Sequence, residues 1–164
     1  TMTDTAICSE CGAVHARADV EFAFKLPDPI FALPAEERAR RCQIGKEECT
    51  LDDERFFLRG LIPLPVRGRD RPYSIGAWAE IDADTRARVR ELWSDEAQSR
   101  EPRFRATLAN AIRYFPSTLG LPVCIQLTGP TTRPDFHIGD PDHPLAKEQA
   151  GGISEHRALE YTDL

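Results

Sequence analysis

Five cysteines are the residues of this chain whose types and spacing point most directly to chemistry, and Cys8 and Cys11 are separated by only two residues. Two thiolates at this spacing can both point inward from one tight turn, and Gly12 lets the backbone amides turn toward the sulfurs. Structural zinc sites are tetrahedral and usually take their four ligands from two such pairs. The Cys-x-x-Cys-Gly sequence therefore predicts a zinc-knuckle-like turn at the N-terminus.

Two sets of residues can supply the rest of the zinc site. Cys42 and Cys49 form a second pair, which the six intervening residues make looser than a typical knuckle. His15, four residues after Cys11, competes as a fourth ligand. The open ligand sets are Cys8, Cys11, Cys42 and Cys49, or Cys8, Cys11 and Cys49 with His15.

Other chemistries of a Cys-x-x-Cys sequence fit this chain less well. A redox-active pair normally follows a strand and opens a helix, whereas Cys8 lies almost at the start of the sequence. Haem attachment requires a histidine directly after the second cysteine, and Gly12 stands there. The fifth cysteine, Cys124, lies in an apolar segment and is interpreted as a small core residue.

Sequence patterns typical of catalytic sites do not occur. The chain contains no Gly-x-Ser-x-Gly elbow, Walker loop, Gly-x-Gly-x-x-Gly or His-Glu-x-x-His. The zinc-deaminase pattern is also absent. We expect His143 to cap a helix, His137 to lie in a strand and His156 to be solvated, so no catalytic residue is predicted.

One basic cluster accompanies an expected hairpin. Its members are Arg55, Arg59, Arg67, Arg69, Arg71 and Arg133. Three of them, Arg67, Arg69 and Arg71, would share the hairpin tip, where they could meet an anionic group. A solvated turn accounts for the same three residues without any ligand.

Length and charge limit the classes of function. The 164 residues fit one domain, 2–164, with 6–52 as the cysteine-rich, metal-binding segment and 53–164 as the sheet and the C-terminal helices. The net charge of −6 argues against nonspecific nucleic-acid binding and against anionic membranes, and it suits a protein partner. No stretch approaches the ~20 apolar residues of a membrane span, and no signal-peptide layout occurs. We expect a cytoplasmic protein with reduced cysteines.

The order of the expected elements predicts an α+β fold with a central antiparallel sheet and helices packed on one side. Expected strands cover 19–24, 56–66, 73–81, 121–127 and 133–138, and the second and third of these form a hairpin. Expected helices cover 34–41, 84–97, 142–151 and the residues after 154. The segment 104–114 fits either a strand or a helix.

Several of these fragments together resemble the uncharacterised bacterial family known as domain of unknown function 2199. The matching pieces are Cys8-x-x-Cys11-Gly12 with His15, Arg41-Cys42, Cys49-x-Leu51-Asp52, Phe56-Phe57-Leu58-Arg59-Gly60, Ile62-Pro63, Gly76-Ala77-Trp78, Arg133-Pro134 and the segment from His143 to Ile153. The chain departs from the family pattern after Phe104, where Arg105-Ala106-Thr107-Leu108 replaces a Gly-Trp-Leu-like step. The resemblance implies a bacterial cytosolic origin and a cysteine metal site, but no substrate.

Three functions follow, in decreasing order of preference. The first is a binding module with a mainly structural zinc, of which an antitoxin-like or immunity partner of a basic toxin is one version. The second is a zinc-dependent hydrolytic enzyme, in which Cys8, Cys11 and Cys49 leave one metal position open for water and His15 or Glu48 is the base. The third is a redox sensor that releases zinc when its thiolates are oxidised.

Overall fold

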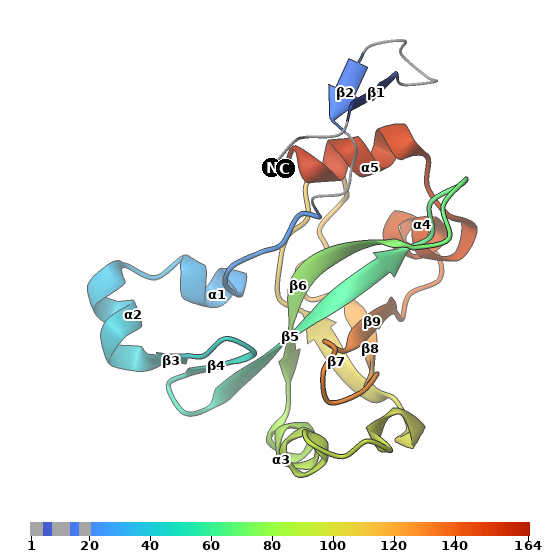
Figure 1. Ribbon diagram of the computed structural model, residues 1–164. Helices are drawn as coiled ribbons and strands as arrows, with labels where there is room; N and C mark the ends of the chain where they lie inside the picture. Colours follow the sequence, from blue (N-terminus) through green and yellow to red (C-terminus); the bar gives the residue numbers. More distant parts are fainter. Residues whose placement is uncertain (1–4, 8–13, 17–20) are drawn as a thin grey trace.

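Five consecutive strands close into a mixed β-barrel that carries the rest of this α+β fold (Figure 1). The computed structural model describes residues 5–7, 14–16 and 21–164, with side chains from residue 21 onward. The barrel strands are β5 (Arg55–Leu64), β6 (Tyr73–Ile81), β7 (Phe104–Leu108), β8 (Pro122–Gln126) and β9 (Asp135–Ile138). Neighbours along the chain pair antiparallel, and β9 returns to pair with β5 in parallel.

The parallel pairing that closes the sheet corrects the expected antiparallel arrangement. Leu61 of β5 pairs with Asp135 of β9, and the Leu61 amide donates to the carbonyl of Pro134. This approach is possible because Gly60 has no side chain: a Cβ there would lie 2.4 Å from the Phe136 ring and 2.8 Å from the Pro134 oxygen. The parallel pair forms between segments far apart in the sequence, so local alternation of residues does not indicate it.

Two further strands extend the sheet beyond the barrel. β3 (Cys42–Ile44) and β4 (Glu48–Leu51) form an antiparallel hairpin, and β4 continues the ladder onto β5. β3 is therefore the edge strand of this extension. A separate two-stranded ribbon pairs β1 (Thr5–Ile7) with β2 (Val14–Ala16).

The helices lie at both ends of the barrel rather than on one side as expected. α3 (Ala83–Leu92) lies at one end, whereas α4 (Pro144–Gly151) and α5 (Glu155–Thr162) lie at the other (Figure 1). α1 (Asp28–Phe31) and α2 (Ala35–Arg41) lead into the β3–β4 hairpin, and a 3-10 turn, η1 (Gln98–Arg100), precedes β7. In the part of the chain that the structure describes, no helix is long and apolar enough to cross a membrane.

Side-chain caps fix where the longer helices begin. The Asp82 carboxylate accepts from the amide of Thr85 at the start of α3. The Nδ1 atom of His143 accepts from the amide of Leu145, which confirms the predicted capping role of His143 at α4. These bonds satisfy backbone amides that have no partner within the helix.

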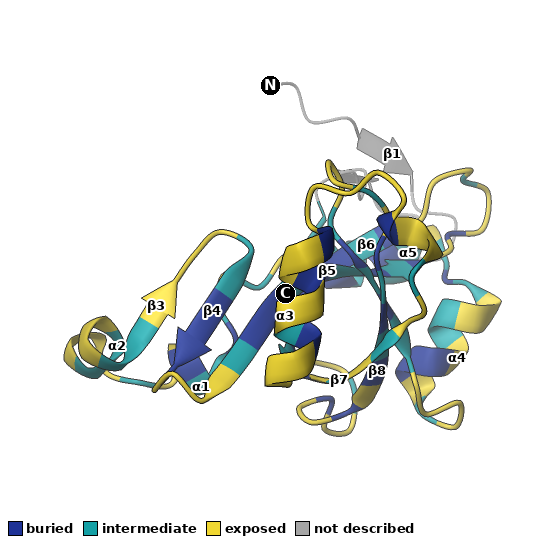
Figure 2. Ribbon diagram, turned by 90° about the horizontal axis from the view of Figure 1, so that it is seen from below, coloured by how far each residue is buried: buried dark blue, intermediate teal, exposed yellow. Residues whose placement is uncertain are grey.

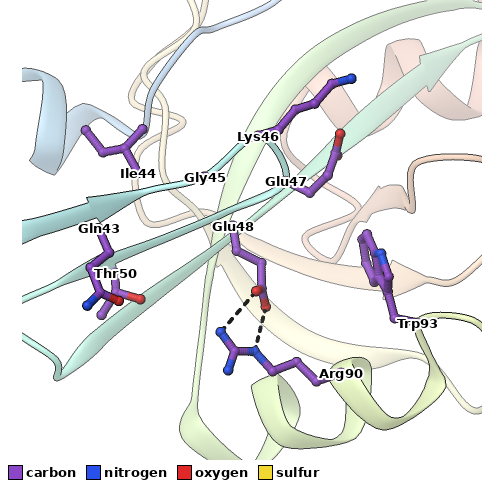
Figure 3. Close-up of a pocket in the computed structure, with 9 residues that line it drawn as sticks. All are labelled: Gln43, Ile44, Gly45, Lys46, Glu47, Glu48, Thr50, Arg90 and Trp93. Carbon is purple, nitrogen blue, oxygen red and sulfur yellow. Dashed lines mark hydrogen bonds and ion pairs between the residues drawn. The ribbon is translucent and has the colours of Figure 1, made fainter.

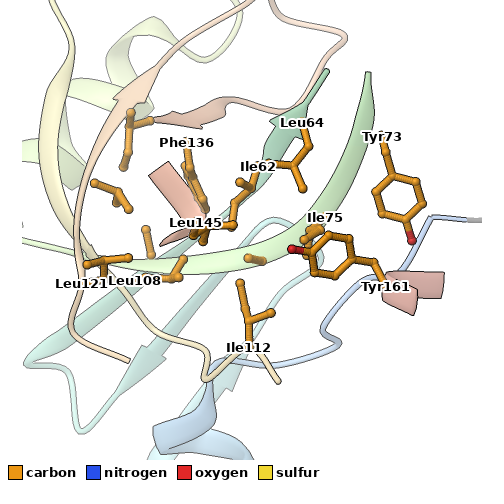
Figure 4. Packing of buried hydrophobic residues seen from close by; sticks show 14 of the residues in the cluster. Ile62, Leu64, Tyr73, Ile75, Leu108, Ile112, Leu121, Phe136, Leu145 and Tyr161 are labelled. Atoms are coloured by element: carbon orange, nitrogen blue, oxygen red, sulfur yellow. The ribbon is translucent and has the colours of Figure 1, made fainter. Parts of the chain in front are cut away.

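Apolar side chains fill the barrel interior. Ile62, Ile75, Leu108 and Phe136 point inward from four strands, and Tyr161 of α5 closes one end (Figure 4). A second, smaller cluster, which we call the outer cluster, lies outside the barrel. It consists of Ile30, Cys49, Leu51, Phe57, Trp78 and Ala109. Figure 2 shows buried residues continuing from the barrel into β4, so the hairpin is anchored by this second cluster.

A strap formed by residues 21–28 crosses the barrel wall at β6. The Phe24 amide donates to the carbonyl of Gly76, and the Gly76 amide donates to the carbonyl of Phe22. The strap can lie this close because a Cβ on Gly76 would be 2.6 Å from the Cβ of Ala23. Of the strand expected at 19–24, the described residues contain only the isolated bridge between Ala23 and Gly76.

Asn110 ties this strap to the barrel from a fully buried position. Its Oδ1 accepts from the Trp78 amide, and its Nδ2 donates to the Leu26 carbonyl and to Asp28. We expect Asn110→Ala to lower the free energy of unfolding by about 2 to 3 kcal/mol, because it leaves buried backbone groups unpaired. Urea denaturation measures this loss. A change no larger than that of the exposed control Ser99→Ala would show that the amide network is dispensable.

Candidate functional site

The β3–β4 hairpin brings Cys42 and Cys49 together on one face. Cys42 lies opposite Leu51, and Cys49 lies opposite Ile44. Residues opposite one another share a face, so the two cysteines occupy diagonal positions about 7–8 Å apart at the backbone. The chain supplies this geometry locally, because the three-residue turn 45–47 folds β3 directly back onto β4.

The surroundings of both thiols favour the neutral, protonated form. Cys49 is only 2% exposed and packs among the apolar residues of the outer cluster. Burial raises the pKa of Cys49 to about 11, and the nearby Cys42 thiol adds to that effect. Burial also raises the pKa of Cys42. A metal bound here would therefore displace protons from both thiols, and its affinity would increase with pH.

The two thiols are two of the predicted zinc ligands, and the side chains of the other predicted ligands are outside the described part of the chain. Cys8 and Cys11 lie outside the described residues. The backbone of His15 pairs with Ala6 in the β1–β2 ribbon, and its side chain is likewise outside the described part. Among the residues that are described, no group of three or more histidine, cysteine, aspartate or glutamate side chains is arranged to hold a metal. The ligand set therefore stays a prediction.

Cys124 faces outward from the barrel instead of into its core. Its neighbours in β8, Val123 and Ile125, are buried, whereas Cys124 is half-buried on the alternate face and lies opposite His137 of β9. Burial lowers the pKa of His137 and raises that of Asp135, two residues away on the same strand. The charged forms of both residues are therefore disfavoured.

A groove lies between the β3–β4 hairpin and α3. It encloses about 570 Å³. Its lining residues are Gln43, Ile44, Gly45, Lys46, Glu47, Glu48, Thr50, Arg90 and Trp93 (Figure 3). The face of the hairpin that carries Glu48 turns toward α3, so this groove and the two cysteines lie on opposite faces of the hairpin.

A second groove of about 610 Å³ begins at the same turn. It shares Lys46, Glu47 and Trp93 with the first and continues to Leu61 and the β8–β9 loop at 130–133. Trp93 is therefore a common wall of both grooves. We call the surface formed by Lys46, Glu47, Glu48, Arg90, Trp93 and Arg133 the turn surface.

Two ion pairs hold the hairpin turn in place. Glu48 pairs with Arg90 of α3 at 3.2 Å, and Glu47 pairs with Arg133 at 3.1 Å. Both are bidentate, which fixes their orientation even though they are partly exposed. These contacts join three segments that are distant in the sequence, which is why the sequence patterns did not indicate them.

Trp93 is the residue whose position sequence reasoning misjudged most. Its helical spacing with Val89 and Leu92 predicts a buried face. Instead α3 ends at Leu92, Trp93 follows as its C-terminal cap, and the indole is 37% exposed whereas Val89 is fully buried. The helix was expected to continue to residue 97, so the sequence pattern contained no signal for the exposure of Trp93.

The predicted basic cluster does not form as a unit. Arg55 pairs with Glu80, Arg69 with Glu155 and Arg71 with Glu21. At the hairpin tip, Arg69 and Arg71 are thus each paired with an acid from another part of the chain. Arg59 and Arg133 lie close enough for the charge of Arg133 to lower the pKa of Arg59.

Comparison with known proteins identifies a family and no individual relative. A family model described as an uncharacterised protein conserved in bacteria, DUF2199, matches residues 7–153. The match includes the β3–β4 hairpin, both grooves and all the predicted zinc ligands. No curated protein and no solved structure matches the chain.

Proposed function

Because the chain belongs to the DUF2199 family, whose description assigns no activity, we propose its function from the geometry: it is a non-enzymatic module that binds a partner protein through the turn surface. The observation that carries this proposal is the exposed Trp93 at the junction of two grooves. Tryptophan is over-represented among the residues that dominate protein–protein binding energies. Charged residues rim it, as in the polar rim of such interfaces.

The unpaired edge of β3 is a second feature that favours partner binding next to the turn surface. The amide of Gly45 donates to the carbonyl of Glu48. Hydrogen-bonded and non-hydrogen-bonded pairs alternate along an antiparallel ladder, so the amide and carbonyl groups of the neighbouring residue Ile44 point away from β4. The Ile44 side chain is 48% exposed. An extended segment of a partner can pair with such an edge while its side chains enter the adjoining groove.

A structural zinc would reinforce this hairpin. Bound by Cys8, Cys11, Cys42 and Cys49, the metal would fix both strands whose turn forms the grooves. Bound by Cys8, Cys11, Cys49 and His15, it would hold β4 alone. Zinc in a closed four-ligand site supplies folding energy and performs no reaction. We further propose that the protein works in the cytoplasm, where cysteines stay reduced and can act as metal ligands.

A photo-crosslinking residue tests the binding proposal directly. Placed at Lys46 in bacterial cells that carry the native gene, it should capture a discrete protein. The matched control is the same residue at the exposed Lys147 of α4, which lies away from the turn surface. Trp93→Ala should abolish the adduct, because it removes the shared wall of both grooves, whereas Leu119→Ala, another exposed apolar residue, should not. Equal capture from both positions, or capture unaffected by Trp93→Ala, would contradict the proposal.

A further inference from the structure

Arg59 forms no ion pair or hydrogen bond with an acidic side chain among the described residues, although the charge of Glu47 reaches it. Its Nε atom is buried and has no hydrogen-bond partner. Its Nη1 donates to the carbonyl of Lys46 at 3.3 Å, and the guanidinium stacks on Trp78 at 5.6 Å. Buried guanidinium N–H groups rarely lack a partner in folded proteins, and where they do, a bound ion or ligand can supply the acceptor.

The neighbours of Arg59 increase the local positive charge. Arg133 lies near enough to lower the pKa of Arg59, an effect second only to burial. Glu47 is the carboxylate that acts on Arg59, but its two oxygens are already held by Arg133. Two guanidinium groups therefore share one carboxylate, and Lys46, next to Glu47 in the hairpin turn, lines the same groove as Arg133.

Four other arginines of the chain differ from Arg59 in the direction of their pKa shift. The pKa values of Arg41, Arg55, Arg88 and Arg157 are all raised, in each case with a hydrogen-bonded acid among the causes. Arg59 is the arginine in the described residues whose pKa is lowered.

We propose that Arg59, Arg133 and Lys46 form a binding site for an oxyanion, a carboxylate or a phosphate group, at the edge of the second groove. Lys46 and Arg133 line this groove. Arg59 is next to it, because its Nη1 donates to the carbonyl of Lys46. The planar guanidinium offers paired donors whose spacing matches carboxylate and phosphate oxygens. The site does not depend on the proposed partner protein, although an acidic side chain of that partner would fit it.

Arginine side-chain NMR can test the site with inorganic phosphate and succinate as probes. Each is titrated at constant ionic strength against sodium chloride. We expect the Arg59 Nε–H resonance to shift and saturate with a dissociation constant of about 1–10 mM, a weak affinity on the usual scale. Saturation by phosphate alone identifies a phosphate site, and saturation by succinate alone identifies a carboxylate site; either supports the proposal.

Variants separate a binding role from a structural one. Arg59→Gln and Lys46→Gln should each weaken binding, the first about tenfold or more because it removes the paired donors. Arg86→Gln, which removes another stacked arginine, should leave the affinity unchanged. If Arg59→Gln does not fold, Lys46→Gln at the turn provides the same comparison. Absence of saturation with both probes, or equal shifts with chloride, would overturn the site while leaving the crosslinking result unaffected.

Discussion

Gly60→Ala should lower the free energy of unfolding by about 3 kcal/mol or more, an effect at the upper end of overpacking substitutions. The added Cβ would lie 2.4 Å from two atoms of the Phe136 ring and 2.8 Å from the Pro134 carbonyl oxygen. The ring is fully buried and the carbonyl accepts the Leu61 amide that joins β5 to β9, so neither group can move freely. Urea denaturation followed by tryptophan fluorescence measures the loss.

Gly151→Ala is the matched control. A Cβ at Gly151 would meet no atom within 4 Å, and the residue lies at the end of α4, where alanine is the better helix former. Its free energy of unfolding should stay within about 1 kcal/mol of the parent protein. The double variant Gly60→Ala with Phe136→Leu should recover part of the loss if the ring is the obstacle. A single Gly60→Ala variant as stable as Gly151→Ala would show that β5 and β9 do not approach as described.

The elements that local sequence specifies were predicted, and the barrel closure was not. The β5–β6 hairpin and the α4 start at His143 follow from turn residues and a capping side chain within a few positions. The closure depends on Gly60 meeting Phe136, and no local pattern links them. The segment 104–114 fitted either a helix or a strand, and its first part forms strand β7. Pairing with β6 and β8 decides this, and these are contacts between segments distant in the sequence.

The candidate site, like the fold, was predicted only in part. The pairing of Cys42 with Cys49 was predicted from their types, and the hairpin register places both on one face. Arg59 and Arg133 were noted in the sequence, but only the closed barrel makes them neighbours. The grooves were missed because they form between the hairpin, α3 and the β8–β9 loop, three segments whose spacing the sequence does not encode locally.

Purified protein should contain about one zinc ion per chain, and its removal by a chelator should lower the melting temperature by about 10 °C. The energy of a structural metal is folding energy, because the unfolded chain cannot offer the assembled ligands. Here the metal would join the N-terminal Cys8 and Cys11 to the β3–β4 hairpin. Elemental analysis and calorimetry with and without chelator measure the two effects.

Cysteine-to-serine variants show which residues hold the metal. Cys8→Ser and Cys49→Ser should lose zinc, since both residues belong to each ligand set. Cys124→Ser is the control and should keep zinc, because that thiol faces outward from β8 at a position unrelated to the hairpin. A zinc content that is normal in Cys49→Ser and lost in Cys124→Ser would contradict the assignment, as would metal-free protein purified without chelator.

The fourth ligand is decided by comparing Cys42→Ser with His15→Ala. If Cys42 completes the site, its loss should release zinc, and His15→Ala should keep it. The hairpin geometry favours this result, because Cys42 already lies on the same face as Cys49, and a tetrahedral metal could bridge the two with a small shift of the edge strand. Zinc lost only in His15→Ala would instead make the β1–β2 ribbon the second half of the site. Cys42 would then be a partly buried thiol beside the outer cluster.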